Sequence, residues 1–161
     1  MKNVPDLPPA VAPELTHVTD LFVDLGPLLD VGDTPRGRRR IIPIIGGSAS
    51  GPRLNGRILD LGADWQVIGS DGLGEIDTRY ALQTDDGALI DIRNPGVRAA
   101  SASVVARLAA GAEVDPSEYY FRTSPRLFTT DPRHDWVNAR VFIGVGQRLA
   151  AQVVMRVYEV S

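Results

Sequence analysis

EIDTRYALQTDDGALIDIRN, residues 75–94, is the stretch of the chain that decides its fold. Apolar and polar side chains alternate on both sides of the central TDDGA, as is typical of half-buried β-strands. Asp85 and Asp86 suit a type I turn, and Gly87 suits the left-handed position that follows it. The stretch therefore predicts a β-hairpin with a three-residue loop. A two-residue Asp86–Gly87 loop is the alternative, and it would shift the register of the strands.

The three-residue loop determines which residues face each other across the hairpin. It predicts two apolar and two polar pairs, namely Leu82–Ile90, Tyr80–Ile92, Ala81–Asp91 and Arg79–Arg93. Like charges directly opposite each other are unfavourable, so Arg79 and Arg93 need an anion nearby. That anion is Asp77, Asp91 or the carboxylate of a ligand. The alternative is a solvated or intersubunit face of salt bridges.

Short alternating segments recur along the rest of the chain, separated by glycine, aspartate and proline. Outside the hairpin, whose strands are expected at 75–84 and 88–94, they lie at about residues 15–25, 38–45, 53–60, 63–69, 119–124, 137–147 and 151–160. Many short strands with regular turn signals predict an antiparallel sandwich or barrel.

One helix is expected, in SASVVARLAAG at residues 101–111. Ser101 or Ser103 suits its N-cap, and Gly111 suits its end. The apolar stripe of this helix consists of Val104, Val105 and Leu108.

The N-terminal residues 1–14 contain four prolines and predict an irregular arm that packs loosely or reaches onto a neighbouring subunit. Residues 15–161 then form a single domain.

The composition excludes several classes of protein. The chain has 161 residues, no cysteine and only two histidines, so disulfides, thiol nucleophiles and the common zinc sites are excluded. A net charge of −3 argues against a generally basic nucleic-acid-binding protein. No apolar stretch approaches the length of a membrane span, and the N-terminus does not resemble a signal peptide. We expect a cytoplasmic protein that needs neither metal nor cofactor.

SEYYFRTS, residues 117–124, combines three aromatic side chains with an arginine. In a strand, Tyr120 and Arg122 point to the same face, because side chains alternate between the two faces. An aromatic ring beside a guanidinium group suits a planar, anionic small molecule. The alternative is a core strand whose Arg122 reaches solvent or an acidic partner.

Other residues extend this candidate site. In GADWQVI, residues 62–68, Asp64 is the candidate general acid or base and Trp65 a candidate aromatic wall, with Tyr120 as the alternative proton donor. Trp136 is a second candidate wall, although either tryptophan can instead fill the core. The candidate substrate-binding residues are Arg38, Trp65, Arg79, Arg93, Arg122 and Trp136. If Tyr80 and Ile92 point inward, Arg79 and Arg93 point outward, and carboxylate binding rests on Arg122 together with Arg38 or Arg40.

Five segments resemble a bacterial and fungal family catalogued as domain of unknown function 3237. They are GDTPRGRRRIIPIIGG (32–47), GPRLNGRILDLGADWQ (51–66), TRYALQTDDGALIDIRNPGVR (78–98), RLAAGAEVDPSEYYFRTSPRLF (107–128) and VYEV (157–160). The resemblance covers the chain from about residue 15 to its end. Asp91, where the family commonly has an aromatic residue, and VRAAS at residues 97–101 depart from the family pattern.

The resemblance implies a closed antiparallel β-barrel of the lipocalin or streptavidin kind, which holds one small ligand. It also implies an activity similar to that of 4-hydroxylaminobenzoate lyase, which converts a hydroxylamino-aromatic acid to a catechol acid and releases ammonia. Two functions are then expected. One is a cofactor-free lyase or isomerase acting on an aromatic or conjugated carboxylic acid. The other is a non-catalytic barrel that binds such an acid. In either case we expect a homo-oligomer.

Overall fold

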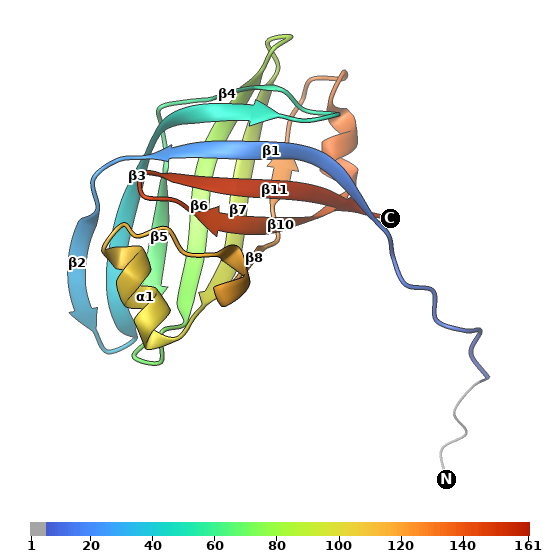
Figure 1. Cartoon of the computed structure of the whole chain (residues 1–161). Helices are drawn as coiled ribbons and strands as arrows, with labels where there is room; N and C mark the ends of the chain where they lie inside the picture. The colour runs from blue at the N-terminus through green and yellow to red at the C-terminus, as the bar shows by residue number, and fades with distance from the viewer. Residues whose placement is uncertain (1–5) are drawn as a thin grey trace.

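The computed structural model describes residues 6–161 and is a closed antiparallel β-barrel (Figure 1). The barrel strands follow one another around the wall in the order β1, β3, β5, β6, β7, β8, β10 and β11, and β11 pairs with β1 to close it. Their bounds are β1 Leu15–Leu25, β3 Gly37–Ser50, β5 Ala63–Ile68, β6 Gly74–Thr84, β7 Leu89–Ala99, β8 Tyr120–Thr123, β10 Val141–Arg148 and β11 Gln152–Val160. The predicted fold class is confirmed.

Three further strands lie beside the barrel wall. β2 (Leu29–Thr34) pairs with β3, β4 (Gly56–Ile58) joins β3 to β6, and β9 (Arg126–Phe128) pairs with β7. The sequence pattern did not predict β2 or β9. Residues 137–147 were predicted as one strand, but they begin within a 3-10 helix, η2 (Asp135–Ala139), and only then enter β10. β2 and β9 have few apolar side chains that face the core, so the alternation of apolar and polar residues gives little signal in these two strands.

The hairpin register agrees with its prediction. β6 and β7 pair Leu82 with Ile90, Tyr80 with Ile92 and Arg79 with Arg93. Gly87 has φ of +88°, and its N–H donates to the Thr84 carbonyl at 2.9 Å. The left-handed glycine thus closes the three-residue loop and sets every pair that follows.

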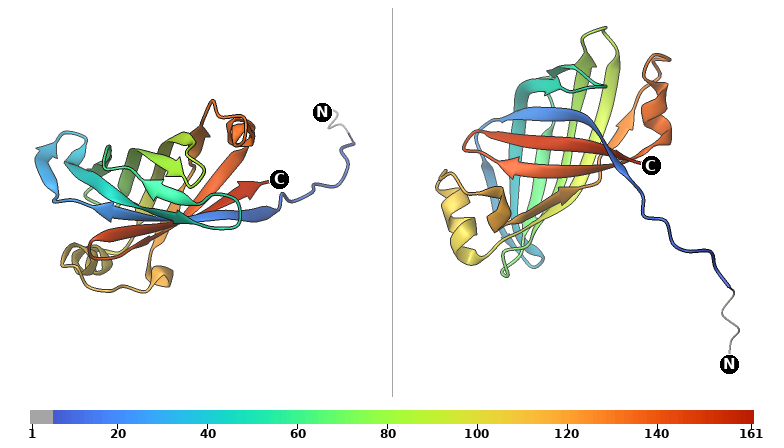
Figure 2. Two further views of the ribbon diagram at one scale, coloured as in Figure 1. Left: turned by 90° about the horizontal axis from the view of Figure 1, so that it is seen from above. Right: turned by 45° about the vertical axis from the view of Figure 1, so that its right-hand side comes forward.

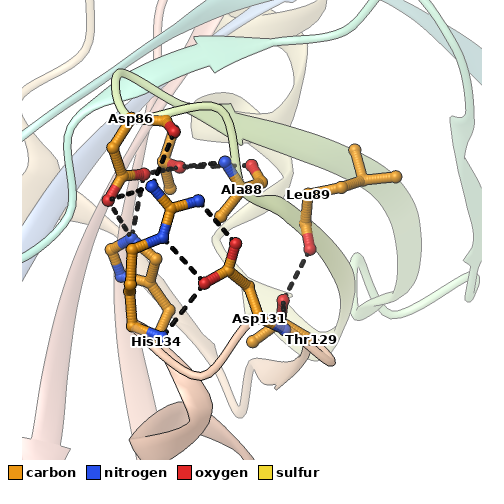
Figure 3. A network of polar contacts seen from close by, with 8 residues as sticks. Asp86, Ala88, Leu89, Thr129, Asp131 and His134 are labelled. Atoms are coloured by element: carbon orange, nitrogen blue, oxygen red, sulfur yellow. Dashed lines mark hydrogen bonds and ion pairs between the residues drawn. The ribbon is translucent and has the colours of Figure 1, made fainter.

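The tip of this hairpin is tied to the loop that precedes η2 (Figure 3). The Asp86 carboxylate contacts His134 Nε2 at 2.9 Å, and Arg133 donates to the Asp86 carbonyl at 2.9 Å. Arg133 also donates to Asp131 at 2.6 Å. Thr129 Oγ1 donates to the Leu89 carbonyl at 2.8 Å, so side chains from both segments close this end of the barrel.

Inside the barrel, the inward row of each strand changes character along its length. Near the hairpin turn it is apolar, and Leu82, Ile90 and Ile92 are at most 1% exposed. Each such buried side chain stabilises the fold by about 1.5–3 kcal/mol. Further from the turn the row of β7 continues as Asn94 and then Arg98. One end of the barrel is therefore a dry core, and the other is polar.

Helix α1 (Ala102–Ala109) lies at the polar end, opposite the hairpin tip (Figures 1 and 2). Ser101 Oγ accepts a hydrogen bond from the Val104 N–H at 3.3 Å, which confirms the predicted N-cap. The helix is joined to β8 by a segment that contains a short 3-10 helix, η1 (Pro116–Glu118). Residues 6–14 form no helix or strand, are exposed, and extend away from the barrel (Figure 2). Within residues 6–161, no helix has the length and apolar character that crossing a membrane requires.

Candidate functional site

Most of the residues that the sequence analysis selected lie on the outside of the barrel. Trp65 is 45% exposed and Tyr120 is 54% exposed. Arg79 and Arg93 also point outward, because their neighbours Tyr80 and Ile92 face the core. Arg93 donates to Asp77 at 3.2 Å, so an aspartate supplies the anion that this arginine was expected to need.

The other candidate arginines also have local partners. Arg38 pairs with Asp30 and with Asp33 on β2. Arg122 donates to the Phe121 carbonyl at 2.9 Å, and its guanidinium carbon lies 5.1 Å from the centre of the Tyr120 ring. The aromatic and arginine strip of β8 is thus real, but it lines a shallow depression on the outer surface beside Val97.

Trp136 lies on η2, partly buried against Phe142. The Arg53 guanidinium stacks on its ring at 3.6 Å. This position is near the apolar end of the barrel, away from the other candidates. The structure therefore does not bring Trp65, Tyr120 and Trp136 together around one ligand.

A cavity lies inside the barrel. Among the candidate site residues from the sequence, Asp64 is the one that lines this cavity within the described residues 6–161. Its position on β5 directs it inward, next to Gln66 on the same row. Gln66 Nε2 donates to Asp64 Oδ2 at 2.6 Å, and Thr78 Oγ1 donates to Asp64 Oδ1 at 2.9 Å. Arg40 in turn donates to Gln66 Oε1 at 2.9 Å. A continuous polar chain therefore links the arginine to the buried carboxyl group.

Burial raises the pKa of the Asp64 carboxyl above its ordinary value. The hydrogen bonds from Gln66 and Thr78 act in the opposite direction, because they stabilise the charged form. Burial also raises the pKa of the nearby Tyr80 hydroxyl, which keeps that group neutral. A carboxyl group with a raised pKa inside a cavity is the kind of group that exchanges a proton with a bound molecule.

Three buried polar atoms inside the barrel have no hydrogen-bond partner among the described residues. They are Arg40 Nε, the Tyr80 hydroxyl and Asn94 Oδ1. Tyr80 and Asn94 are each 3% exposed and line the same cavity as Asp64. Native proteins leave few buried polar groups unpaired, because each one costs free energy. Unpaired groups gathered at one cavity indicate that a ligand or ordered water completes them.

The cavity has a narrow inner part and a wider mouth. The inner part, around Asp64 and Tyr80, has a volume of about 30 Å³, and the mouth has about 310 Å³. Both are lined by Ile42, Gln66, Arg98 and Arg148, so they are adjacent. The mouth is also lined by Val105, Leu108 and Ala109 of α1. A small ligand of mixed polarity fits this arrangement.

The guanidinium groups of Arg40, Arg98 and Arg148 come from three different strands to the mouth. Burial lowers the pKa of all three arginines, and the charge of Arg40 lowers the pKa of the other two further. Arginine stays protonated even so, which makes the mouth positively charged.

Sequence reasoning had mentioned Arg40 but missed Arg98, Arg148 and Asn94. Asn94 and Arg98 continue the inward row of Ile90 and Ile92, so a signal existed. When the register of a hairpin is known, polar residues on its inward, otherwise apolar face indicate a cavity inside the barrel. Arg148 gave no comparable signal, because it lies at the end of β10 and its direction depends on the closure of the barrel.

Comparison with known proteins places this geometry in a family. The chain belongs to the family described as "Protein of unknown function (DUF3237)", whose model matches residues 13–160. It is 38% identical over 147 residues to a UPF0311 protein of Rhodopseudomonas palustris strain TIE-1, covering 91% of this chain and 96% of the relative. The resemblance noted in the sequence is thereby confirmed.

Solved structures have the same fold. A protein of unknown function from Rhodopseudomonas palustris superimposes with a TM-score of 0.91 at 36% identity, over 94% of this chain and 100% of that one. A β-barrel-like protein from Acinetobacter baumannii gives 0.83 at 42% identity, over 98% and 100%. An enzyme from Penicillium herquei gives 0.72 over 96% and 98%, and at 17% identity this likeness concerns the fold alone.

Proposed function

We propose that the protein is a cofactor-free lyase or isomerase that acts on a small aromatic or conjugated carboxylic acid bound inside the barrel. The observation that carries the proposal is the buried Asp64 carboxyl group, which has a raised pKa and faces a cavity with unpaired polar atoms. An ammonia-releasing reaction like that of 4-hydroxylaminobenzoate lyase consumes one water, whose oxygen balances the nitrogen that leaves as ammonia, and it requires protons to be moved. A shift of a double bond requires only that a proton be moved. Neither requires an oxidant.

Each group around the cavity has a role in this proposal. The arginines of the mouth bind the carboxylate of the substrate by charge-assisted hydrogen bonds. Asp64 donates or accepts the proton, and Gln66 and Thr78 hold it in one orientation. Tyr80 and Asn94 bind polar atoms of the substrate body. The enzyme from Penicillium herquei supports the proposal only in that a barrel of this fold hosts catalysis.

The test is turnover by the Asp64→Asn variant. Hydroxylaminobenzoates and conjugated acids are incubated with the protein, and ammonia and organic products are quantified. A positioned acid or base contributes about 10²–10⁴-fold, so Asp64→Asn should lose activity by that factor. Asp60→Asn, at an exposed position, is the matched control and should retain it. Full turnover by Asp64→Asn would refute the role of Asp64.

A non-catalytic binding barrel is the second candidate. It is favoured by the hydrogen bonds that both oxygens of Asp64 already accept, and by the small inner cavity of about 30 Å³. A melting screen with aromatic acids separates the candidates. A ligand at 100 times its Kd stabilises the fold by about 2.7 kcal/mol. Binding that survives Asp64→Asn, without turnover of any acid that binds, would favour the carrier.

A further inference from the structure

The charges at the mouth of the barrel narrow the class of substrate. We propose that the ligand is a dianion, a planar conjugated acid with two carboxylates that are bound together by Arg40, Arg98 and Arg148. This inference rests on the proposed function for the position of the ligand, and it adds the number of charges that the ligand carries. Nothing in the sequence analysis assigned these three arginines to a common site.

The first argument is the balance of charge. Three guanidinium groups line the mouth, and Asp64 is the one acidic side chain that lines either part of the cavity. With Asp64 ionised, two positive charges remain uncompensated; with Asp64 protonated, three remain. Asp30 raises the pKa of Arg40 more than Asp64 does, but it lines neither part of the cavity and is already paired with Arg38. A ligand with one carboxylate would leave the mouth positively charged in either state of Asp64, whereas a dicarboxylate neutralises it when Asp64 is ionised.

The second argument is the contrast with arginines elsewhere in the chain. Seven exposed arginines have carboxylate partners, in the pairs Arg38–Asp30, Arg53–Glu159, Arg93–Asp77, Arg107–Glu118, Arg133–Asp131, Arg140–Glu159 and Arg156–Asp20. Within residues 6–161, Arg40, Arg98 and Arg148 have none within salt-bridge distance. Water screens an exposed charge at little cost, but like charges in a partly buried pocket repel strongly. Arg40, Arg98 and Arg148 are thus more buried than these paired arginines and yet have no carboxylate partner.

The third argument is the set of donors that remain free. Arg40 Nε is buried without a partner, and Arg98 makes no side-chain hydrogen bond within the part of the chain described. Arg148 donates through one terminal nitrogen to the carbonyls of Leu149 and Gln152. Guanidinium groups bind carboxylates through two parallel hydrogen bonds, so the free edges suit two carboxylates better than one.

The fourth argument concerns the body of the ligand. Val105, Leu108 and Ala109 of α1 and Ile42 of β3 line the same mouth as the arginines. Apolar side chains beside a cationic group suit a flat hydrocarbon skeleton with charged substituents. Sugars and phosphorylated polyols would leave these apolar walls facing hydroxyl groups.

The experiment compares probes of the same shape and different charge. The Kd of each of the three benzenedicarboxylates is measured by calorimetry against the methylbenzoate with the same substitution pattern, at constant ionic strength. At least one dicarboxylate should bind about 10- to 100-fold more tightly than its methyl counterpart, since each added charge-assisted hydrogen bond contributes on that scale. The isomer with the largest ratio also reports the spacing of the two carboxylate sites.

Variants then locate the site. Arg98→Gln and Arg148→Gln should each reduce the ratio toward unity. Arg57→Gln, an exposed position on β4, removes the same charge from the protein and should leave the ratio unchanged. Equal affinity of wild-type protein for dicarboxylates and methylbenzoates overturns the inference, as does a ratio that survives both mouth variants.

The two proposals fail separately. Turnover of a monocarboxylate without any preference for dicarboxylates leaves the proposed function standing and refutes the dianion. Preference for a dicarboxylate that depends on Arg98 and Arg148, without turnover of any acid, supports the dianion and counts against the lyase or isomerase.

Discussion

Tyr80 is a single residue whose buried hydroxyl lowers the stability of the fold while it lines the cavity. Its ring is packed in the core, 3% exposed, while its hydroxyl has no hydrogen-bond partner among the described residues. Phenylalanine would fill the same space without burying an unpaired polar atom. Under the proposed function, the tyrosine hydroxyl at this position binds a polar atom of the substrate.

Tyr80→Phe should raise the stability of the ligand-free protein by about 1–3 kcal/mol, because it removes the desolvation cost of the hydroxyl. It should weaken the binding of whichever acid the melting screen identifies. Urea denaturation of the free protein and calorimetry with that acid measure the two effects. Tyr120→Phe, on the exposed face of β8, is the control for stability and should change it by less than about 0.5 kcal/mol. A destabilised Tyr80→Phe variant would contradict this reading.

Asp64 predicts an unusual dependence of stability on pH. Its pKa is raised in the folded state, so the folded protein holds this proton more tightly than the unfolded chain does. Its contribution is complete below the unfolded pKa and is lost as pH rises through the folded pKa.

Asp64→Asn should therefore be more stable than wild type near neutral pH, and the difference should shrink as pH falls toward 4. The amide can still accept from Gln66 and donate to the Thr78 hydroxyl, so the hydrogen bonds are preserved. Urea denaturation of both proteins between pH 4 and 8 measures the difference. A difference that is constant over this range would show that the Asp64 pKa is not raised.

At the scale of the elements, the β6–β7 hairpin organises the molecule. Its loop sets the register, and the register sends Asn94 and Arg98 inward and Arg93 outward. The same hairpin thus builds the apolar core near its turn and the polar wall of the cavity further on. Its tip is held by side chains of the loop before η2.

Gly87→Ala tests this element. Gly87 has φ of +88° and no atom within 4 Å of the place where a Cβ would lie, so the substitution acts through the backbone alone. Alanine should destabilise the protein by about 1–2 kcal/mol, and Gly87→Asn by less, because asparagine tolerates the left-handed region better. Urea midpoints of the two variants measure this. Equal stability of Gly87→Ala and wild type would mean that the loop rearranges.

At the scale of the whole molecule, β1 and β11 pair to close the barrel, and the two termini of the domain meet there. The Ser161 N–H donates to the Glu14 carbonyl at 3.0 Å, so the domain begins where the arm ends. Residues 6–14 extend from this point and are exposed.

Deletion of residues 1–12 should leave the free energy of unfolding within about 0.5 kcal/mol of the full chain. Deletion of residues 157–161, which removes the pairing of Val157 and Val160 with β1, should prevent stable folding. Urea denaturation at two protein concentrations measures both. A loss of stability in the first variant that depends on concentration would instead show that the arm binds a neighbouring subunit, the association expected from the sequence.

The sequence by itself determined the all-β class, the hairpin with its register, and the helix with its cap. These features depend on contacts between near neighbours, which alternation, turn chemistry and capping express directly. Closure of the barrel and the meeting of Arg40, Arg98 and Arg148 were decided only by the tertiary structure. Those three residues are on strands far apart in the chain, and which face of each strand is inside depends on how the whole sheet curves. The sequence therefore placed Tyr120 and Arg122 on the same face of a strand, but it did not show that this face lies on the outside of the barrel.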